Sequence, residues 1–331
     1  MKTILITGSG GLVGSQAVEY FGQKTNTIVG IDNNNRAKWF GDKGCVSQSI
    51  EKNKKFCNYE HHCIDIANYN NISEIFRKNQ FDAIIHCAGQ PSHEFSAVMP
   101  YDDFLTNTVG TMNLLTATKI YCPDAPFIFT STNKVYGDNP NKLPITESAF
   151  RFDFYETNGI NEKMSIDNCI HSPFGANKAA ADLIVQEYGK YFGLNTVCFR
   201  CGCITGKNHQ SVEQHGFLNY ICKIVKNKEP YTIYGYKGKQ VRDNIHAYDL
   251  VTAFDEFIQN PKKGEVYNIG GGKENSISIM EVLKNTSTPI TFADARIGDH
   301  ICYYTDYTKF KNHYPNWKIT ISINDIMKEL L

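Results

Sequence analysis

Short apolar runs alternate with amphipathic segments over the first two hundred residues of the chain. The runs rich in β-branched and aromatic residues are expected to be buried strands, and they cover 4–6, 27–31, 61–66, 83–87, 127–130 and 196–200. Between them, apolar residues recur with helical spacing over 12–21, 72–78, 104–120 and 176–192. This alternation predicts a doubly wound α/β fold, a parallel sheet with helices on both faces. Such sheets bind ligands at the carboxyl ends of their strands.

The alternation weakens after residue 205, where aromatic and polar positions mix and a helical stretch follows only at 249–259. We therefore expect two parts. Residues 1–205, with a returning segment at about 238–262, form the sheet domain. Residues 206–237 and 263–331 form a smaller C-terminal lobe that binds substrate over the edge of the sheet.

The first strand runs directly into a turn in which Gly8, Gly11 and Gly14 have the spacing G-x-x-G-x-x-G. A helix begins behind this turn and offers free N–H groups and its positive dipole end, and glycine lets a phosphate approach the backbone. Asp32 follows the second strand, 18 residues after Gly14, where a carboxylate can bond the ribose of a dinucleotide. The pattern predicts a Rossmann-type domain that binds NAD, because an acid there repels the 2′-phosphate of NADP. The plainer alternative for Asp32 is a turn residue ahead of Asn33.

The ends of the other predicted strands extend this site, with small residues where a cofactor must lie close to the backbone. The residues expected to contact NAD on these grounds are Gly8, Gly11, Leu12, Val13, Gly14, Asp32, Asn33, Asp65, Ile66, Ala88 and Gly89.

Composition narrows the function classes. The 34 basic and 34 acidic residues cancel, and no basic tract marks a nucleic-acid binder. No apolar run reaches the ~18 residues of a membrane span, and we expect no signal peptide, because the first strand begins directly after Met1. The eleven cysteines suggest free thiols in a reducing cytoplasm. We expect no metal site, because Cys57, His61, His62 and Cys63 lie partly on a strand with alternating faces, and Cys201 and Cys203 lack a second pair.

Two later segments carry a family resemblance. STNKVYG at 131–137 follows the fifth strand, and HSPFGANK at 171–178 opens a long helix. With TGSGGLVG at 7–14, and with Asn107 and Gly110, they resemble the extended short-chain dehydrogenase/reductase superfamily over nearly the whole chain. The form that the chain resembles most is the CDP-tyvelose (CDP-paratose) 2-epimerase group, through 131–138, 171–182, 192–197, 238–243 and 267–271.

The resemblance implies an NAD-dependent epimerase of a CDP- or UDP-hexose, with a role in polysaccharide biosynthesis. Hydride leaves a ring carbon for NAD, the keto sugar turns over, and hydride returns to the other face. Thr132 matches the hydroxyl that bonds the reacting oxygen, and Lys178 matches the lysine that binds the nicotinamide ribose. Asn107 joins the implied NAD contacts. A homodimer or homotetramer through 104–120 and 176–192 is also implied.

One position departs from the family pattern. The family's catalytic tyrosine lies four residues before the lysine, and here that residue is Phe174, which cannot take a proton. Loss of a general base typically costs ~10²–10⁴ in rate. The chain is then a disabled variant, a binding protein that does not turn its ligand over, or an enzyme with another base. The candidate bases are Ser172, His171, Tyr155, Glu162, Lys134, His93 and Cys203.

The resemblance also suggests substrate contacts. Arg242 and Arg296 match arginines that clamp a diphosphate, and a planar guanidinium suits that task. Asn133 and Lys134 stand where related 4,6-dehydratases carry an Asp-Glu pair, which argues against dehydration. The full set of residues expected on the substrate is His93, Lys134, Arg242 and Arg296. A dehydrogenase or reductase that releases NADH is the remaining alternative.

Overall fold

Seven parallel strands form the central sheet of the computed structural model, which describes residues 2–24, 26–213 and 215–331. Their spatial order is β12 (Glu265–Ile269), β8 (Thr196–Cys201), β5 (Phe127–Thr132), β4 (Ala83–His86), β1 (Thr3–Thr7), β2 (Thr27–Ile31) and β3 (Tyr59–His62). The chain winds outward from β1 to β3 and then returns to β4 on the other side of β1. The strand order therefore reverses between β1 and β4, where doubly wound sheets bind ligands.

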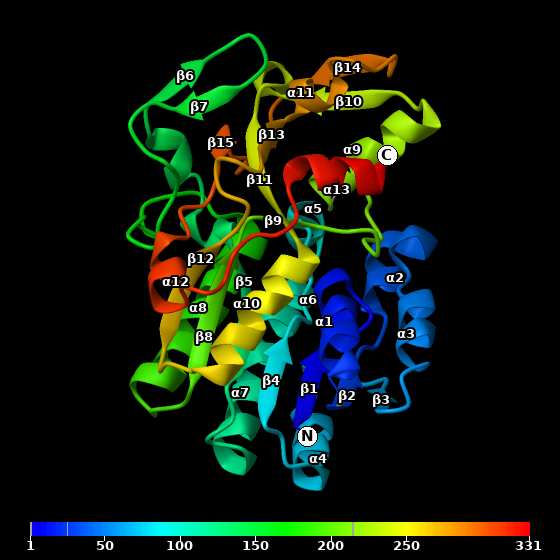
Figure 1. Cartoon of the computed structure of the whole chain (residues 1–331), viewed down its shortest axis with the longest axis vertical. Helices are drawn as coiled ribbons and strands as arrows, with labels where there is room; N and C mark the ends of the chain where they lie inside the picture. Colours follow the sequence, from blue (N-terminus) through cyan, green and yellow to red (C-terminus); the bar gives the residue numbers. More distant parts are fainter. Residues whose placement is uncertain (1, 25, 214) are drawn as a thin grey trace.

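Helices cover both faces of this sheet (Figure 1). One face packs against α1 (Leu12–Gln23), α10 (Ala247–Gln259) and α12 (Thr308–His313). The other packs against α4 (Tyr69–Lys78), α7 (Gly110–Tyr121) and α8 (Ser172–Lys190). Strand β1 shows why, since Ile4 and Ile6 belong to the first core and Leu5 to the second. Both faces are apolar because both are buried.

Shorter helices fill the connections of the sheet domain. After β2 come α2 (Asn35–Phe40), a 3₁₀ turn (Gly41–Gly44) and α3 (Ser47–Asn53). Before α7 come α5 (His93–Val98), α6 (Pro100–Phe104) and a π-helical turn (Leu105–Val109). Two 3₁₀ turns, Asn133–Tyr136 and Asn139–Lys142, follow β5.

A smaller lobe lies above the sheet domain in Figure 1. Its main sheet joins β9 (Cys203–Thr205), β11 (Val241–His246), β13 (Ser276–Ser278) and β15 (Cys302–Tyr303). Strands β10 (Tyr231–Tyr234) and β14 (Ile290–Ala293) form a second sheet, and β6 (Ile145–Glu147) and β7 (Phe152–Phe154) form a hairpin. The other elements are α9 (Phe217–Asn227), a 3₁₀ turn (Tyr236–Gly238), α11 (Ile279–Leu283) and α13 (Ile323–Leu330).

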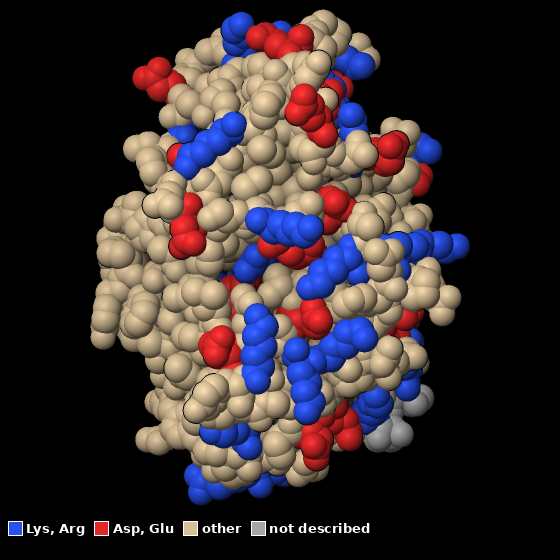
Figure 2. Space-filling model, turned by 90° about the vertical axis from the view of Figure 1, so that its left-hand side faces the viewer, with Lys and Arg blue, Asp and Glu red and all other residues tan. Residues whose placement is uncertain are grey.

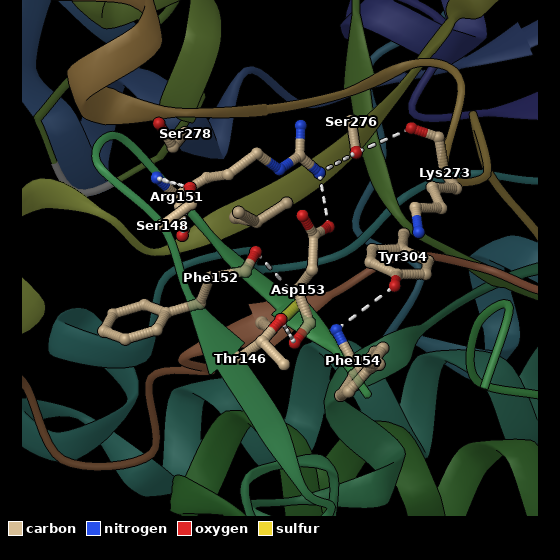
Figure 3. A network of polar contacts seen from close by, with 12 residues as sticks. Thr146, Ser148, Arg151, Phe152, Asp153, Phe154, Lys273, Ser276, Ser278 and Tyr304 are labelled. Carbon is tan, nitrogen blue, oxygen red and sulfur yellow. Dashed lines mark hydrogen bonds and ion pairs between the residues drawn. The ribbon is translucent and has the colours of Figure 1, made fainter. Parts of the chain in front are cut away.

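Arg151 ties the β6–β7 hairpin to the rest of the lobe (Figure 3). Its Nη2 donates to Ser276 Oγ at 2.7 Å and lies 3.0 Å from Asp153 Oδ1, so one guanidinium joins β13 to the hairpin. The Phe154 N–H donates to the Tyr304 hydroxyl at 3.2 Å. These bonds hold a two-stranded unit that would be marginal alone.

The predicted fold class, a doubly wound parallel sheet, is confirmed. The third strand was misplaced, because β3 spans Tyr59–His62 rather than 61–66. The alternation that misled the prediction comes from Ile64 and Ile66, which pack into the same core after the chain has left the sheet. The helix expected over 104–120 is present as the end of α6, the π-helical turn and α7, which follow one another without a break. The expected domain bounds also differ from the sheets: β12 lies beyond the segment 238–262 but completes the large sheet, whereas β11 lies inside that segment but joins the main sheet of the lobe.

Three further observations concern the charges, the helices and the cysteines. On the face in Figure 2, lysine and arginine side chains are interspersed with aspartate and glutamate rather than gathered in a field of one sign. Over the part of the chain that the structure describes, no helix combines the length and apolar character needed to cross a bilayer. All eleven cysteines are free thiols.

Candidate active site

A cavity of about 440 Å³ opens where the strands of the large sheet end beneath the lobe. The residues that the sequence assigned to the cofactor and the substrate, together with Thr132, Phe174 and Lys178, all line it, whereas four of the seven candidate bases do not. Strand ends supply the floor, and β11, β10 and the segment after β14 supply the opposite wall. The cavity therefore brings together residues that lie almost three hundred positions apart in the chain.

The glycine turn between β1 and α1 forms one end of the cavity. Gly8 has φ +67°, and a Cβ there would lie 2.7 Å from the backbone nitrogen of Ala88. A Cβ on Gly14 would collide with the Gly8 carbonyl oxygen. Helix α1 begins at Gly11 with no side-chain cap and no acid in its first turn. Its first N–H groups are left for an anion.

Asp32 lies at the end of β2 with its carboxylate fixed by the backbone. Oδ2 accepts from the Gly10 N–H at 2.9 Å, and Oδ1 accepts from the Asn34 N–H at 2.8 Å. Each oxygen keeps lone-pair capacity for further donors. Asn33 lines the cavity beside it, and Asp65 and Ile66 line it after β3.

A buried amide network holds the middle of the cavity wall, and the sequence had indicated only Asn107 of it. Asp103 Oδ1 accepts from Gln90 Nε2 at 2.7 Å and from Asn107 Nδ2 at 3.0 Å. Its Oδ2 accepts from Asn177 Nδ2 at 2.6 Å. Burial raises the pKa of Asp103, although these hydrogen bonds act to lower it. The network ties the π-helical turn, where Asn107 lies, to the first turns of α8, and so positions Lys178.

Lys178 is buried on α8 and reaches the end of β5. Its Nζ donates to the Thr130 carbonyl oxygen at 2.8 Å and lies 4.0 Å from the ring centroid of Phe129. Burial lowers the pKa of Lys178 to about 8. Thr132 stands two residues along the same strand, and its Oγ1 accepts from the Lys134 N–H at 3.2 Å. The two predicted catalytic residues thus face one cavity from adjacent elements.

Phe174 lines the cavity one helical turn before Lys178 and is only 7% exposed. Its ring packs edge-on against the His93 ring, with centroids 5.1 Å apart. His93 Nδ1 lies 2.8 Å from Ser172 Oγ, so the imidazole is held to the start of α8. Burial, and next the charge of Lys134, lower the pKa of His93 to about 3.

Cations from three separate segments face the other end of the cavity. Lys134 Nζ donates to the Gly298 carbonyl oxygen at 3.0 Å and lies 3.7 Å from Asp299 Oδ1. Burial lowers the pKa of Lys134 to about 8. Arg242 Nη2 lies 3.8 Å from the same carboxylate oxygen. Burial alone would raise the pKa of Asp299, but the charges of Lys134 and Arg242 outweigh it and the pKa is lowered.

Arg296 is held differently. Its guanidinium lies 3.9 Å from the ring centroid of Tyr234, 3.3 Å from Glu94 Oε1 and 3.6 Å from Glu213 Oε1. None of these partners, nor Asp299, had been singled out from the sequence as a site residue. Contacts across more than eighty positions leave no local signal in one chain.

The comparisons with known proteins agree with this geometry. A model of the NAD dependent epimerase/dehydratase family matches residues 4–270. The chain belongs to this family. It is similar to a CDP-paratose 2-epimerase from Salmonella typhi, at 32% identity over 99% of this chain and 97% of the relative. It is also similar to a dTDP-glucose 4,6-dehydratase from Salmonella typhimurium, at 31% identity over 82% of this chain and 72% of the relative.

Among solved structures, a dTDP-glucose 4,6-dehydratase from Bacillus anthracis in complex with NAD has the same fold. Its TM-score is 0.78 at 23% identity, and the match covers 100% of this chain and 96% of that one. The predicted resemblance to the epimerase/dehydratase enzymes and the predicted cofactor, NAD, are confirmed for the family. The uncapped start of α1 and the backbone-held Asp32 carboxylate fit a pyrophosphate and a ribose.

Proposed function

We propose that the protein epimerises a CDP- or UDP-linked hexose through a keto sugar. The observation that carries the proposal is the shared cavity, which Thr132 and Lys178 line together with the glycine turn and the cations Lys134 and Arg242. A dinucleotide on the glycine turn and a diphosphate on the cations would place a nicotinamide and a sugar ring in the middle. The curated relative with 32% identity is a CDP-paratose 2-epimerase by name.

NAD, when bound, supplies the hydride acceptor and donor. Thr132 Oγ1 has the reach to bond the sugar oxygen that gains carbonyl character, because its bonds within the chain are long, 3.2 Å from the Lys134 N–H and 3.4 Å to Asn133 Oδ1. The Lys178 ammonium lines the same cavity and is held in place by the Thr130 carbonyl oxygen. Its positive charge stabilises an oxyanion that forms on the sugar. Its buried carbonyl contact keeps the ammonium in place before substrate arrives.

Epimerisation is favoured over dehydration by the residues that follow Thr132. Elimination of a sugar hydroxyl needs an acid and a base side by side, and Asn133 and Lys134 supply no carboxyl group. Lys134 is instead turned to Gly298 and Asp299 at the cationic end. Together with Arg242 and Arg296 it suits a diphosphate, since charge-assisted bonds to phosphate are the strong ones.

The test uses a panel of CDP- and UDP-hexoses in deuterated water, read by NMR. We expect a new epimer without deuterium at the inverted carbon, because the hydride stays on the enzyme. A lasting rise in absorbance at 340 nm indicates a dehydrogenase instead. Binding of the panel without any product favours the silent binding homologue, which Phe174 makes the second candidate.

The assembly and location belong to the same proposal. Met112 on α7, Leu183 on α8 and Tyr191 just after α8 are exposed large apolar side chains, which suit a second copy of this chain. A dimer is expected in sedimentation equilibrium, and Leu183→Glu should dissociate it. A single species of 37.4 kDa in the wild type would contradict this. The eleven free thiols suit the reducing cytoplasm, where a polysaccharide precursor would be made.

A further inference from the structure

The site lacks an evident group to take the proton from the sugar hydroxyl, because Phe174 has none. The structure separates the candidates. Tyr155 is 66% exposed. Glu162 accepts from the Asn268 N–H at 2.7 Å, and His171 Nε2 lies 2.8 Å from the Val135 carbonyl oxygen. None of these three lines the cavity, nor does Ser172.

Three candidates do line the cavity: His93, Lys134 and Cys203. Burial raises the pKa of Cys203 to about 11, which keeps the thiol protonated. Lys134 points to the cationic end, where Gly298 and Asp299 hold its ammonium. His93 alone of the three packs on the Phe174 ring.

The His93 ring is oriented for one task. Nδ1 is engaged by Ser172 Oγ at 2.8 Å, which fixes the ring plane against Phe174. Within the described residues, Nε2 has no hydrogen-bond partner and is left for a ligand. A third group that orients an imidazole so that its other nitrogen can exchange a proton is the usual arrangement of a general base.

We infer that His93 is the acid/base of this enzyme and replaces the phenol that Phe174 lacks. The inference rests on the proposed function. In the forward half, Nε2 of His93 would take the hydroxyl proton while the same carbon gives up its hydride, for which bound NAD would be the acceptor, and the C–O bond would become a carbonyl. In the return half, a hydride adds to the other face of that carbon, and Nε2 returns the proton to the oxygen.

The charges around His93 suggest that substrate prepares it. Without ligand, burial comes first and then Lys134, Arg242 and Arg296 in keeping its pKa near 3, while Asp299 acts in the opposite direction. His215 also lies within electrostatic reach. A bound diphosphate offsets the three cations, so the imidazole becomes a stronger base only when the sugar is present.

The kinetic test compares His93→Asn with Ser172→Ala and with His93→Asn/Phe174→Tyr, using the panel member that the wild type converts fastest. We expect His93→Asn to slow single-turnover epimer formation by ~10²-fold or more at little-changed substrate affinity and melting temperature. Ser172→Ala, which keeps the imidazole, should lose less than ~10-fold. The added phenol should recover part of the loss.

Two results overturn the inference and leave the proposed function standing: a wild-type rate in His93→Asn, or an equal loss in Ser172→Ala. A wild type that converts no member of the panel instead contradicts the proposed function itself. A second measurement needs no variant with altered activity. In protein with ¹⁵N-labelled histidine, the NMR titration midpoint of His93 should rise by at least one pH unit when UDP-glucose or CDP-glucose is bound. A midpoint unmoved by a bound sugar nucleotide contradicts the inference.

Discussion

The two ends of the cavity are built in different ways. The end proposed for the cofactor is made by consecutive residues, Gly8 to Gly14, and its surface is backbone, because a Cβ on Gly8 or Gly14 would collide with other backbone atoms. The end proposed for the substrate is made by long charged side chains from distant segments, and the Lys134–Gly298 hydrogen bond spans 164 positions. Backbone sites depend on local sterics, and side-chain sites depend on how the lobe meets the sheet domain. The two ends should therefore fail differently when they are changed.

Replacing Lys178 should give the largest difference between an effect on rate and an effect on affinity. Lys178→Met should slow epimer formation by ~10²–10³-fold, because it removes the buried charge proposed to stabilise the reacting oxygen. Affinity for UDP-glucose should stay within ~3-fold, since the diphosphate is proposed to bind at Lys134 and Arg242. Single-turnover NMR and calorimetric titration measure the two quantities. Equal losses in rate and affinity would contradict the division of the cavity into two separate ends.

Gly14→Ala tests whether the cofactor end is governed by sterics. The added Cβ meets the Gly8 carbonyl oxygen, which is backbone and cannot swing away. We expect the free energy of unfolding to fall by about 3 kcal/mol in urea titration. Gly11→Ala is the matched control, because its Cβ would lie 3.3 Å from the same oxygen at a φ of −72°. That variant should lose less than ~1 kcal/mol. Similar losses in both contradict the steric account.

The two arginines differ in burial and in partners, and so should differ in how strongly they bind a diphosphate. Arg242→Met should weaken UDP-glucose binding by ~30-fold, because a buried guanidinium makes charge-assisted bonds of full strength. Arg296→Met should weaken it by only ~3-fold, since Glu94 and Glu213 already compete for that charge. Calorimetry of both variants decides the order. A larger effect of Arg296→Met would contradict this order and indicate that the diphosphate binds nearer to Tyr234.

Substrate binding should also depend on pH. The pKa of Lys134 is about 8, so the ammonium is charged below that pH and neutral above it. A diphosphate favours the charged form, and the dissociation constant of UDP-glucose should therefore rise by ~10-fold between pH 7 and pH 9. Lys134→Met should flatten the profile. A wild-type profile that is already flat would show that Lys134 does not contact the diphosphate.

The sheet domain could be predicted from the sequence. Apolar strands, helical periodicity and the glycine turn determine the sheet domain, because each depends on residues within one turn or strand of each other. The same reasoning placed Asp32 at a strand end and marked Phe174 as a departure. It failed at β3, where Ile64 and Ile66 keep a strand-like pattern while packing outside the sheet.

Only the tertiary structure decided which of several polar residues meet. The sequence offered seven candidates for the missing base, and packing of α5 on α8 brought His93 against Phe174. Nothing in the sequence indicated that Asp103 bonds to Gln90, Asn107 and Asn177, because these contacts depend on how the helices pack. Asp299 likewise became the shared partner of Lys134 and Arg242 only through folding. Periodicity records how each residue is buried, and it carries no record of the distant side chain with which that residue shares a charge or a proton.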